Sequence, residues 1–147
     1  MLYGDLVRAS QRVASTAKRS EKVAALAALL RATSPDEIEP AIGLLVGEPR
    51  QGRLGVGWAT VSNLRVAPAD EPTLTIHDVD EALTRIAAIG GSGSQGERAR
   101  AMTDLWSSAT ADEQHHLHRV LTGELRQGAN EGVVADAVAK ASGQPIA

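Results

Sequence analysis

The sequence contains no cysteine and no phenylalanine, and aromatic residues make up only 2% of its 147 residues. The absence of cysteine excludes disulfides and thiolate metal sites. Because aromatic side chains are scarce, Leu, Val, Ile and Ala have to fill the core, which favours packed helices over a β-sheet. No apolar run approaches the roughly 20 residues that cross a bilayer, and the first residues, MLYGDLVRAS, lack the basic and apolar segments of a signal peptide. We therefore expect an all-α protein of the cytoplasm.

The charges are unevenly distributed along the chain. The net charge is −3, which by itself argues against a nucleic-acid partner. Residues 1–31, however, carry six basic and two acidic residues, whereas residues 61–90 carry two basic and five acidic residues. The basic end either offers a local positive surface to an anion or is a solvated helix end, and charge alone leaves both interpretations open.

Apolar residues recur at helical spacing along most of the chain. Capping residues, prolines and glycines mark where the helices begin and end. The expected helices are 2–14, a helix capped by Ser20, a helix that starts at Ser34-Pro35 and carries Ile38 to Leu45, and helices at about 58–66, 78–89, 97–107, 111–121 and 130–141, with Thr110 and Glu113 as a capping box.

A six-residue pattern occurs twice, as GEPRQG at 47–52 and as GELRQG at 123–128, a shift of 76 residues. With that shift, helices, caps and turns of the two halves coincide, and Lys22 falls on Arg98. We interpret this as an internal duplication. It predicts a single compact helical domain of two pseudo-symmetric units, at about 2–66 and about 77–143, joined by a linker at 67–76.

Each repeated turn combines glycines with an arginine, which suits a phosphate. Glycine backbone N–H groups can approach phosphate oxygens closely, and a guanidinium binds them bidentately. Two such turns around a pseudo-two-fold axis would face the two strands of a DNA duplex equivalently. The alternative is that each glycine caps a helix and each arginine interacts with the helix dipole. The candidate DNA-binding residues are Lys18, Arg19, Lys22, Arg50, Gly52, Arg53, Ser92, Ser94, Arg98, Gly123, Arg126 and Gly128.

Four segments resemble the N-terminal DNA-binding domain of bacterial, actinobacterial-type ATP-dependent DNA ligases. The most specific is LTGELRQGANEGVVADAVAKASG at 121–143, which is similar to that domain's closing motif. The others are VASTAKRSEKVAALAALLRA at 13–32, GRLGVGWATV at 52–61 and GGSGSQGERARAM at 90–102. The resemblance covers nearly the whole chain. It implies a helical clamp that binds the minor groove of duplex DNA around a nick, without sequence specificity, in DNA repair, replication or recombination.

Carried over residue by residue, the resemblance places Gly123, Arg126 and Gly128 in the family's phosphate-contacting turn. It places Ser92, Ser94 and Arg98 in the family's Gly-Ser stretch before a cation. Several family members have a basic residue where this chain has Glu124, and an acid at that position weakens a phosphate contact.

The ligases of this type form a lysine–AMP adduct at a Lys-x-Asp-Gly motif, which none of the three lysines of this chain matches. We therefore expect this chain to bind DNA without catalysing a reaction. ATP and Mg²⁺ are expected only for the catalytic domains of the same ligase, which would be its partners, together with nicked or intact duplex DNA, in the bacterial cytoplasm at the nucleoid.

Other residues and other functions were weighed against this interpretation. The histidine cluster 115–118 with Asp112 offers few ligands for a metal, and exposed helix histidines are expected instead. Acids 78–81 are expected in a first helical turn rather than as a catalytic pair, and both tryptophans in the core rather than stacked on bases. A helical-repeat scaffold that binds protein is the main alternative function, and an enzyme complete in itself is the third.

Overall fold

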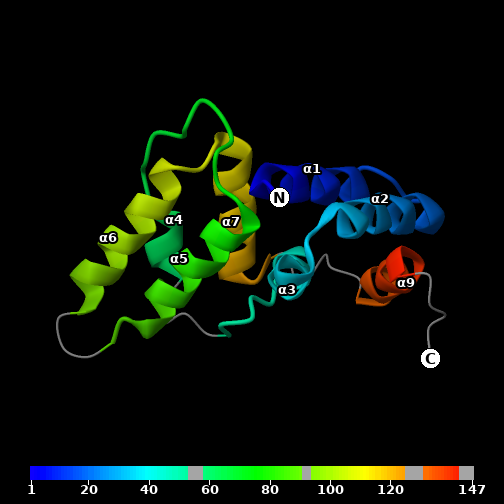
Figure 1. Cartoon of the computed structure of the whole chain (residues 1–147). Coiled ribbons are helices and arrows are strands. Elements are labelled where there is room, and N and C mark those ends of the chain that lie inside the picture. The colour runs from blue at the N-terminus through cyan, green and yellow to red at the C-terminus, as the bar shows by residue number, and fades with distance from the viewer. Residues whose placement is uncertain (53–57, 91–93, 125–130, 143–147) are drawn as a thin grey trace.

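The computed structural model describes residues 1–52, 58–90, 94–124 and 131–142, and for residues 58, 59, 94, 95 and 131 it describes the backbone alone. The helices of these residues are α1 (Tyr3–Ala14), α2 (Arg19–Ala32), the 3₁₀ turn η1 (Pro35–Glu37), α3 (Ile38–Val46), α4 (Trp58–Ser62), α5 (Ile76–Ala88), α6 (Ser94–Ser107), α7 (Ala111–Thr122) and α9 (Glu131–Ser142) (Figure 1). No strand occurs among them, apart from an isolated antiparallel bridge between Leu2 and Thr75. The predicted all-α class is confirmed.

The helices form two adjoining groups, each with one helix taken from the other half of the chain. In Figure 1, α1, α2, α3 and α9 lie together on one side and α4, α5, α6 and α7 on the other. The late helix α9 packs along α2, and the early helix α4 packs on α7. One cluster of buried apolar side chains, including Leu6, Leu44, Leu83 and Leu117, runs through both groups. The two halves therefore share a single core.

Local signals position most helix starts. Thr110 and Glu113 form the predicted capping box at α7, and Thr75 and Asp78 form a second one at α5. The predicted cap at Ser20 is wrong, because α2 already begins at Arg19 and no side chain caps it. There the backbone N–H of Lys18 donates to the hydroxyl of Thr16 at 3.2 Å, and the chain enters the helix two residues earlier than predicted.

Left-handed glycines end α3 and α7, as the capping interpretation predicts. Gly47 has φ 76° and Gly123 has φ 80°, a conformation that costs glycine little. After Gly47 the chain folds back on α3, and the Glu48 N–H donates to the Gly43 carbonyl at 2.9 Å. A Cβ on Gly43 would lie 2.7 Å from the Glu48 carbonyl oxygen, so this turn requires glycine there.

The buried carboxylate of Glu37 ties the chain's first residue and η1 to the start of α5. It accepts hydrogen bonds from the terminal ammonium of Met1 at 3.0 Å, from the Ser34 hydroxyl at 2.9 Å and from the His77 N–H at 3.0 Å. Burial would raise the pKa of Glu37, but these bonds and the ammonium charge outweigh it and lower that pKa. A charged Glu37 is therefore part of the fold. None of the described helices is long and apolar enough to span a bilayer.

Candidate nucleic-acid interface

The first Gly–Arg turn, residues 47–52, is bound to α5 through its arginine. The Arg50 Nε donates to Oδ1 of Asp80 at 2.7 Å, and a terminal nitrogen donates to Oδ2 at 2.7 Å. The side chain of Asp80 is only 11% exposed, against 43% for Arg50. Burial would raise the pKa of Asp80, but the hydrogen bonds from Arg50 and Gln51 and the Arg50 charge lower it. The guanidinium group that sequence analysis assigned to a phosphate is therefore bound by a carboxylate.

The next residue of the turn strengthens the same attachment. The amide nitrogen of Gln51 donates to Oδ1 of Asp80 at 2.6 Å, to its backbone carbonyl at 3.0 Å and to the Thr84 hydroxyl at 3.0 Å. Gly52 follows with φ 70°, and a Cβ there would touch nothing within 4 Å. The turn is therefore held rigidly against α5 up to an open backbone corner at Gly52.

Sequence analysis missed the role of Asp80. It was expected in a first helical turn, but α5 begins at Ile76 and only Asp78 lies in that turn. On the surface, Oε1 of the neighbouring Glu81 pairs with Nε2 of His77 at 3.2 Å. No local pattern links position 80 to position 50, because their contact depends on how α3 packs on α5.

We expect Asp80→Asn to lower the free energy of unfolding by about 1–3 kcal/mol, since it removes a charge-assisted pair and disturbs Gln51. Glu81→Gln is the matched control on the next residue; its pair with His77 is exposed, and a change within about 0.5 kcal/mol is expected. Urea unfolding followed by circular dichroism measures both. Equal losses in the two variants would contradict the role assigned to Asp80.

The second Gly–Arg turn is described only at its beginning. Gly123 ends α7, and Glu124 is exposed. Arg126 and Gly128 lie outside the described residues, as do Arg53 and Ser92, and the side chain of Ser94 is not described. With the shift of 76 residues, Asp80 corresponds to Gly4 and Gly43 to Arg119. The acid that engages Arg50 is therefore not repeated at the corresponding position of the first half.

The remaining candidate cations are mostly engaged in contacts within the protein. Arg19 pairs with Asp136 and so joins α2 to α9. A terminal nitrogen of Arg98 donates to the Ile89 carbonyl at 2.7 Å, at the end of α5. Lys18 forms only a loose, exposed ion pair with Glu21, with 3.9 Å between Nζ and Oε1. Lys22 is half-buried and forms no ion pair within the described part of the chain.

The histidines of α7 occupy three different environments, which corrects the expectation that all are exposed. His115 is exposed, whereas His116 is buried, with Nδ1 hydrogen-bonded to the Tyr3 hydroxyl. The Nε2 of His118 lies 3.1 Å from the Ser62 hydroxyl, and this hydrogen bond connects α7 to α4. Among the described residues, no three acidic or histidine side chains are placed to hold a metal ion. Trp106 is buried, as predicted for a core residue.

Comparison with known proteins identifies the family. The family described as DNA ligase N terminus matches residues 61–139. The chain belongs to this family. Proteins described as "Probable DNA ligase" are similar over nearly its whole length: 45% identity over 146 residues in Rhodococcus jostii, 49% over 146 residues in Nocardia farcinica and 47% over 147 residues in Streptomyces griseus.

These matches cover 99–100% of this chain but only 28–29% of each relative, so the chain spans less than a third of their length. The DNA ligase N terminus match runs from α4 into α9 and contains the second Gly–Arg turn. The first turn lies before the match, in a segment that the ligase relatives cover. The family assignment made from the sequence is confirmed.

Proposed function

We propose that this chain binds nicked and intact duplex DNA through the sugar–phosphate backbone, along the minor groove and without sequence specificity. It would act as the N-terminal DNA-binding domain of an ATP-dependent DNA ligase. The observation that carries the proposal is the family match over a glycine-led turn whose first residue, Gly123, has the left-handed conformation. The Gly123 N–H donates to the Val120 carbonyl at 3.4 Å, but the lack of a side chain lets a phosphate approach the backbone of such a turn closely.

Helix packing supports a pseudo-two-fold arrangement of the two halves. α3 packs on α5, and its counterpart α7 packs on α1. α4 packs on α7, and its counterpart α9 packs on α3. These four contacts thus pair up when the halves are exchanged, as a two-fold axis requires. The most extensive contact, α2 on α9, has no comparable counterpart between α6 and α4. Such an axis would present the two Gly–Arg turns to the two strands of a duplex.

The two turns would contribute differently to DNA binding. At the first turn the guanidinium of Arg50 is bound to Asp80, and the Gly52 N–H donates to the Pro49 carbonyl at 2.9 Å. A phosphate would therefore meet mainly Arg53, the next residue of the chain. At the position that corresponds to Asp80 the other half has Gly4, which carries no carboxylate. We therefore assign the stronger phosphate contact to Arg126, with Gly123 and Gly128.

The exposed start of α2 and the start of α6 would extend the footprint. Lys18 and Lys22 are candidates for long-range attraction, while Arg19 and Arg98 would have to leave their partners to reach a phosphate. Ser92 and Ser94 are candidate hydroxyl donors. Ligation in repair, replication or recombination, at the bacterial nucleoid in the cytoplasm, would depend on catalytic domains of the same ligase, which supply the ATP and Mg²⁺ chemistry.

Fluorescence anisotropy with labelled nicked and intact duplexes at two salt concentrations tests the proposal. Binding should weaken steeply and linearly in a plot of log K against log salt, because each phosphate contact releases counterions, with a slope of about −0.9 per contact. Duplexes of unrelated sequence should bind alike. No binding to either duplex at low salt would refute the proposal and favour a helical scaffold that binds protein.

A further inference from the structure

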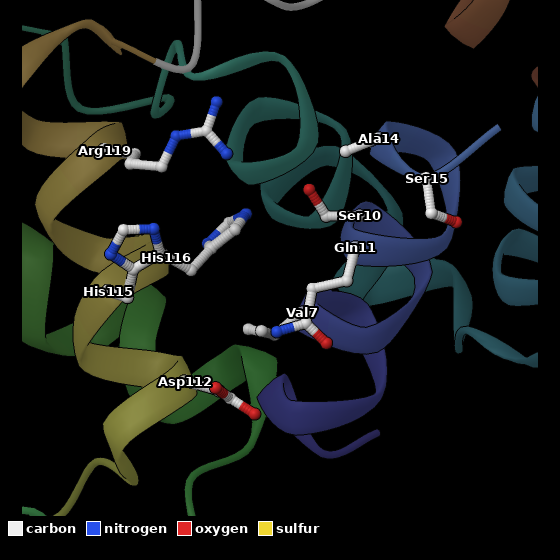
Figure 2. A pocket seen from close by; sticks show the side chains of 9 residues that line it. All are labelled: Val7, Ser10, Gln11, Ala14, Ser15, Asp112, His115, His116 and Arg119. Carbon is white, nitrogen blue, oxygen red and sulfur yellow. The ribbon is translucent and has the colours of Figure 1, made fainter. Parts of the chain in front are cut away.

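A cavity of about 360 Å³ lies between α1 and α7 (Figure 2). Its polar lining consists of Ser10 and Gln11 from α1, of Asp112, His115, His116 and Arg119 from α7, and of Ser15, whose hydroxyl donates to the Arg12 carbonyl. None of these seven belongs to the candidate DNA-binding residues described above. A cavity of this size holds a phosphate group together with part of the molecule that carries it.

Three of the wall residues are hydrogen-bond donors with no partner of their own. In the described part of the chain, the side chains of Ser10, Gln11 and Arg119 form no hydrogen bond or ion pair. Arg119 is half-buried, and Figure 2 shows its guanidinium reaching from α7 into the space between the two helices, opposite Ser10. A half-buried guanidinium without a counterion favours an anion that can accept several hydrogen bonds.

The ring of His116 lies beneath these donors. Its Nδ1 shares a hydrogen bond with the Tyr3 hydroxyl. Burial, and the charge of Glu113, raise the pKa of Tyr3 well above its usual value, so the phenol stays neutral. The other ring nitrogen, Nε2, is buried and has no partner within the described residues, and an oxygen would reach it only if the atoms that cover it move.

Arg119 and His115 line the cavity at the same end as the His116 ring. Burial lowers the pKa of His116, and the charges of Arg119 and His115 lower it further. The acid of the wall, Asp112, lies seven residues before Arg119 on α7, about two turns or roughly 10 Å along the helix. An anion at the Arg119 end therefore avoids most of the repulsion from Asp112.

The cation is specific to the second half of the chain. The position equivalent to Arg119 is Gly43, where a Cβ would already lie 2.7 Å from the Glu48 carbonyl oxygen. In the first half the turn after α3 packs against this position, whereas in the second half the position carries a guanidinium. Arg119 is thus not a requirement of the repeated helical unit.

We propose that the α1–α7 cavity binds a phosphate group, with the guanidinium of Arg119 as its main ligand and Gln11 and Ser10 as further donors. The group belongs either to the DNA backbone or to a free phosphate or small phosphorylated molecule, since the chemistry is the same. Only the first source rests on the proposed DNA binding. In that case the contact surface extends from the second Gly–Arg turn back along α7.

Nuclear magnetic resonance of the whole 147-residue chain tests the site with inorganic phosphate. The side-chain amide of Gln11 and the ring of His116 should shift saturably with phosphate, and not with sodium chloride of equal ionic strength. Arg119→Gln should weaken the phosphate affinity about tenfold or more, because it removes a charge-assisted contact. Arg85→Gln is the matched control: Arg85 is exposed on α5, away from the cavity, and its loss should change nothing.

The inference is overturned if phosphate gives no saturable shift, or if Arg119→Gln leaves the affinity unchanged while the fold is intact by circular dichroism. A short duplex added to the phosphate-saturated protein separates the two sources. Displacement of phosphate assigns the cavity to the DNA backbone, and binding of both together assigns it to a free ligand. If phosphate binds and the duplex does not, the proposal for the cavity holds and the proposed function is wrong. If the duplex binds and phosphate does not, only the proposal for the cavity is wrong.

Discussion

Arg126→Ala should weaken binding to nicked and intact duplex about tenfold or more, and by a similar factor for unrelated sequences. A guanidinium bound to phosphate contributes affinity without reading bases, so its loss should also reduce the magnitude of the salt slope by about one. The free energy of unfolding should stay within about 0.5 kcal/mol, because the proposal assigns the Arg126 side chain to DNA and not to a contact within the protein. Anisotropy across a salt series and urea unfolding measure the two quantities.

The chain provides a matched control for this experiment in the other copy of the turn. Arg50 occupies the equivalent position, but its fork is bound to Asp80. Arg50→Ala should therefore reduce stability more than Arg126→Ala does, and reduce DNA affinity less. If the two variants lose the same affinity, the different roles assigned to the turns are wrong. An unchanged affinity of Arg126→Ala would remove the second turn from the interface.

Acidification should destabilise the protein through His116, by about 3 kcal/mol between pH 6.5 and about 4. Burial, with smaller effects from Arg119 and His115, lowers the pKa of His116 from 6.5 to about 4. Between these two pH values the unfolded chain therefore binds a proton at His116 that the folded chain does not bind. The stabilisation is complete above pH 6.5, falls as the pH drops through the interval, and is lost at about pH 4 and below, at 1.36 kcal/mol per pH unit.

His116→Asn isolates this contribution, because asparagine retains a partner for the Tyr3 hydroxyl and does not titrate. The variant should be less stable at neutral pH, yet its stability should change much less between pH 6.5 and 4 than that of the natural chain. His115→Asn is the control, since His115 is exposed one residue away. Urea unfolding across this range measures the slopes; parallel slopes for the natural chain and His116→Asn would contradict the assignment.

Those parts of the fold that depend on short-range chemistry were predictable from the sequence. The Thr110 and Glu113 capping box, and the glycines that end α3 and α7, are interactions within one helical turn, so a short sequence window contains all the information. The start of α2 was misplaced by two residues because the Thr16 hydroxyl competes for the backbone of Lys18. Helix ends are generally the least certain part of such predictions.

The candidate site was predictable in part. The repeated turns, and the resemblance of 121–143 to ligase N-terminal domains, led to the family that comparison then confirmed. The chemistry of single side chains was less accessible. Arg50 looks free in the sequence but binds Asp80, 30 residues away, and His116 looks exposed but is buried against Tyr3. Both outcomes depend on contacts between helices.

The sequence by itself determined the helical class, the helix caps, the duplicated Gly–Arg pattern and the family, because these depend on neighbouring residues or on motifs in fixed order. Only the tertiary structure decided which arginine is engaged by a carboxylate, which histidine is shielded from water, and that a cavity opens between α1 and α7. These depend on how helices distant in sequence pack. Packing brings Asp80 under one turn, while the other half of the chain has Gly4 at the corresponding position.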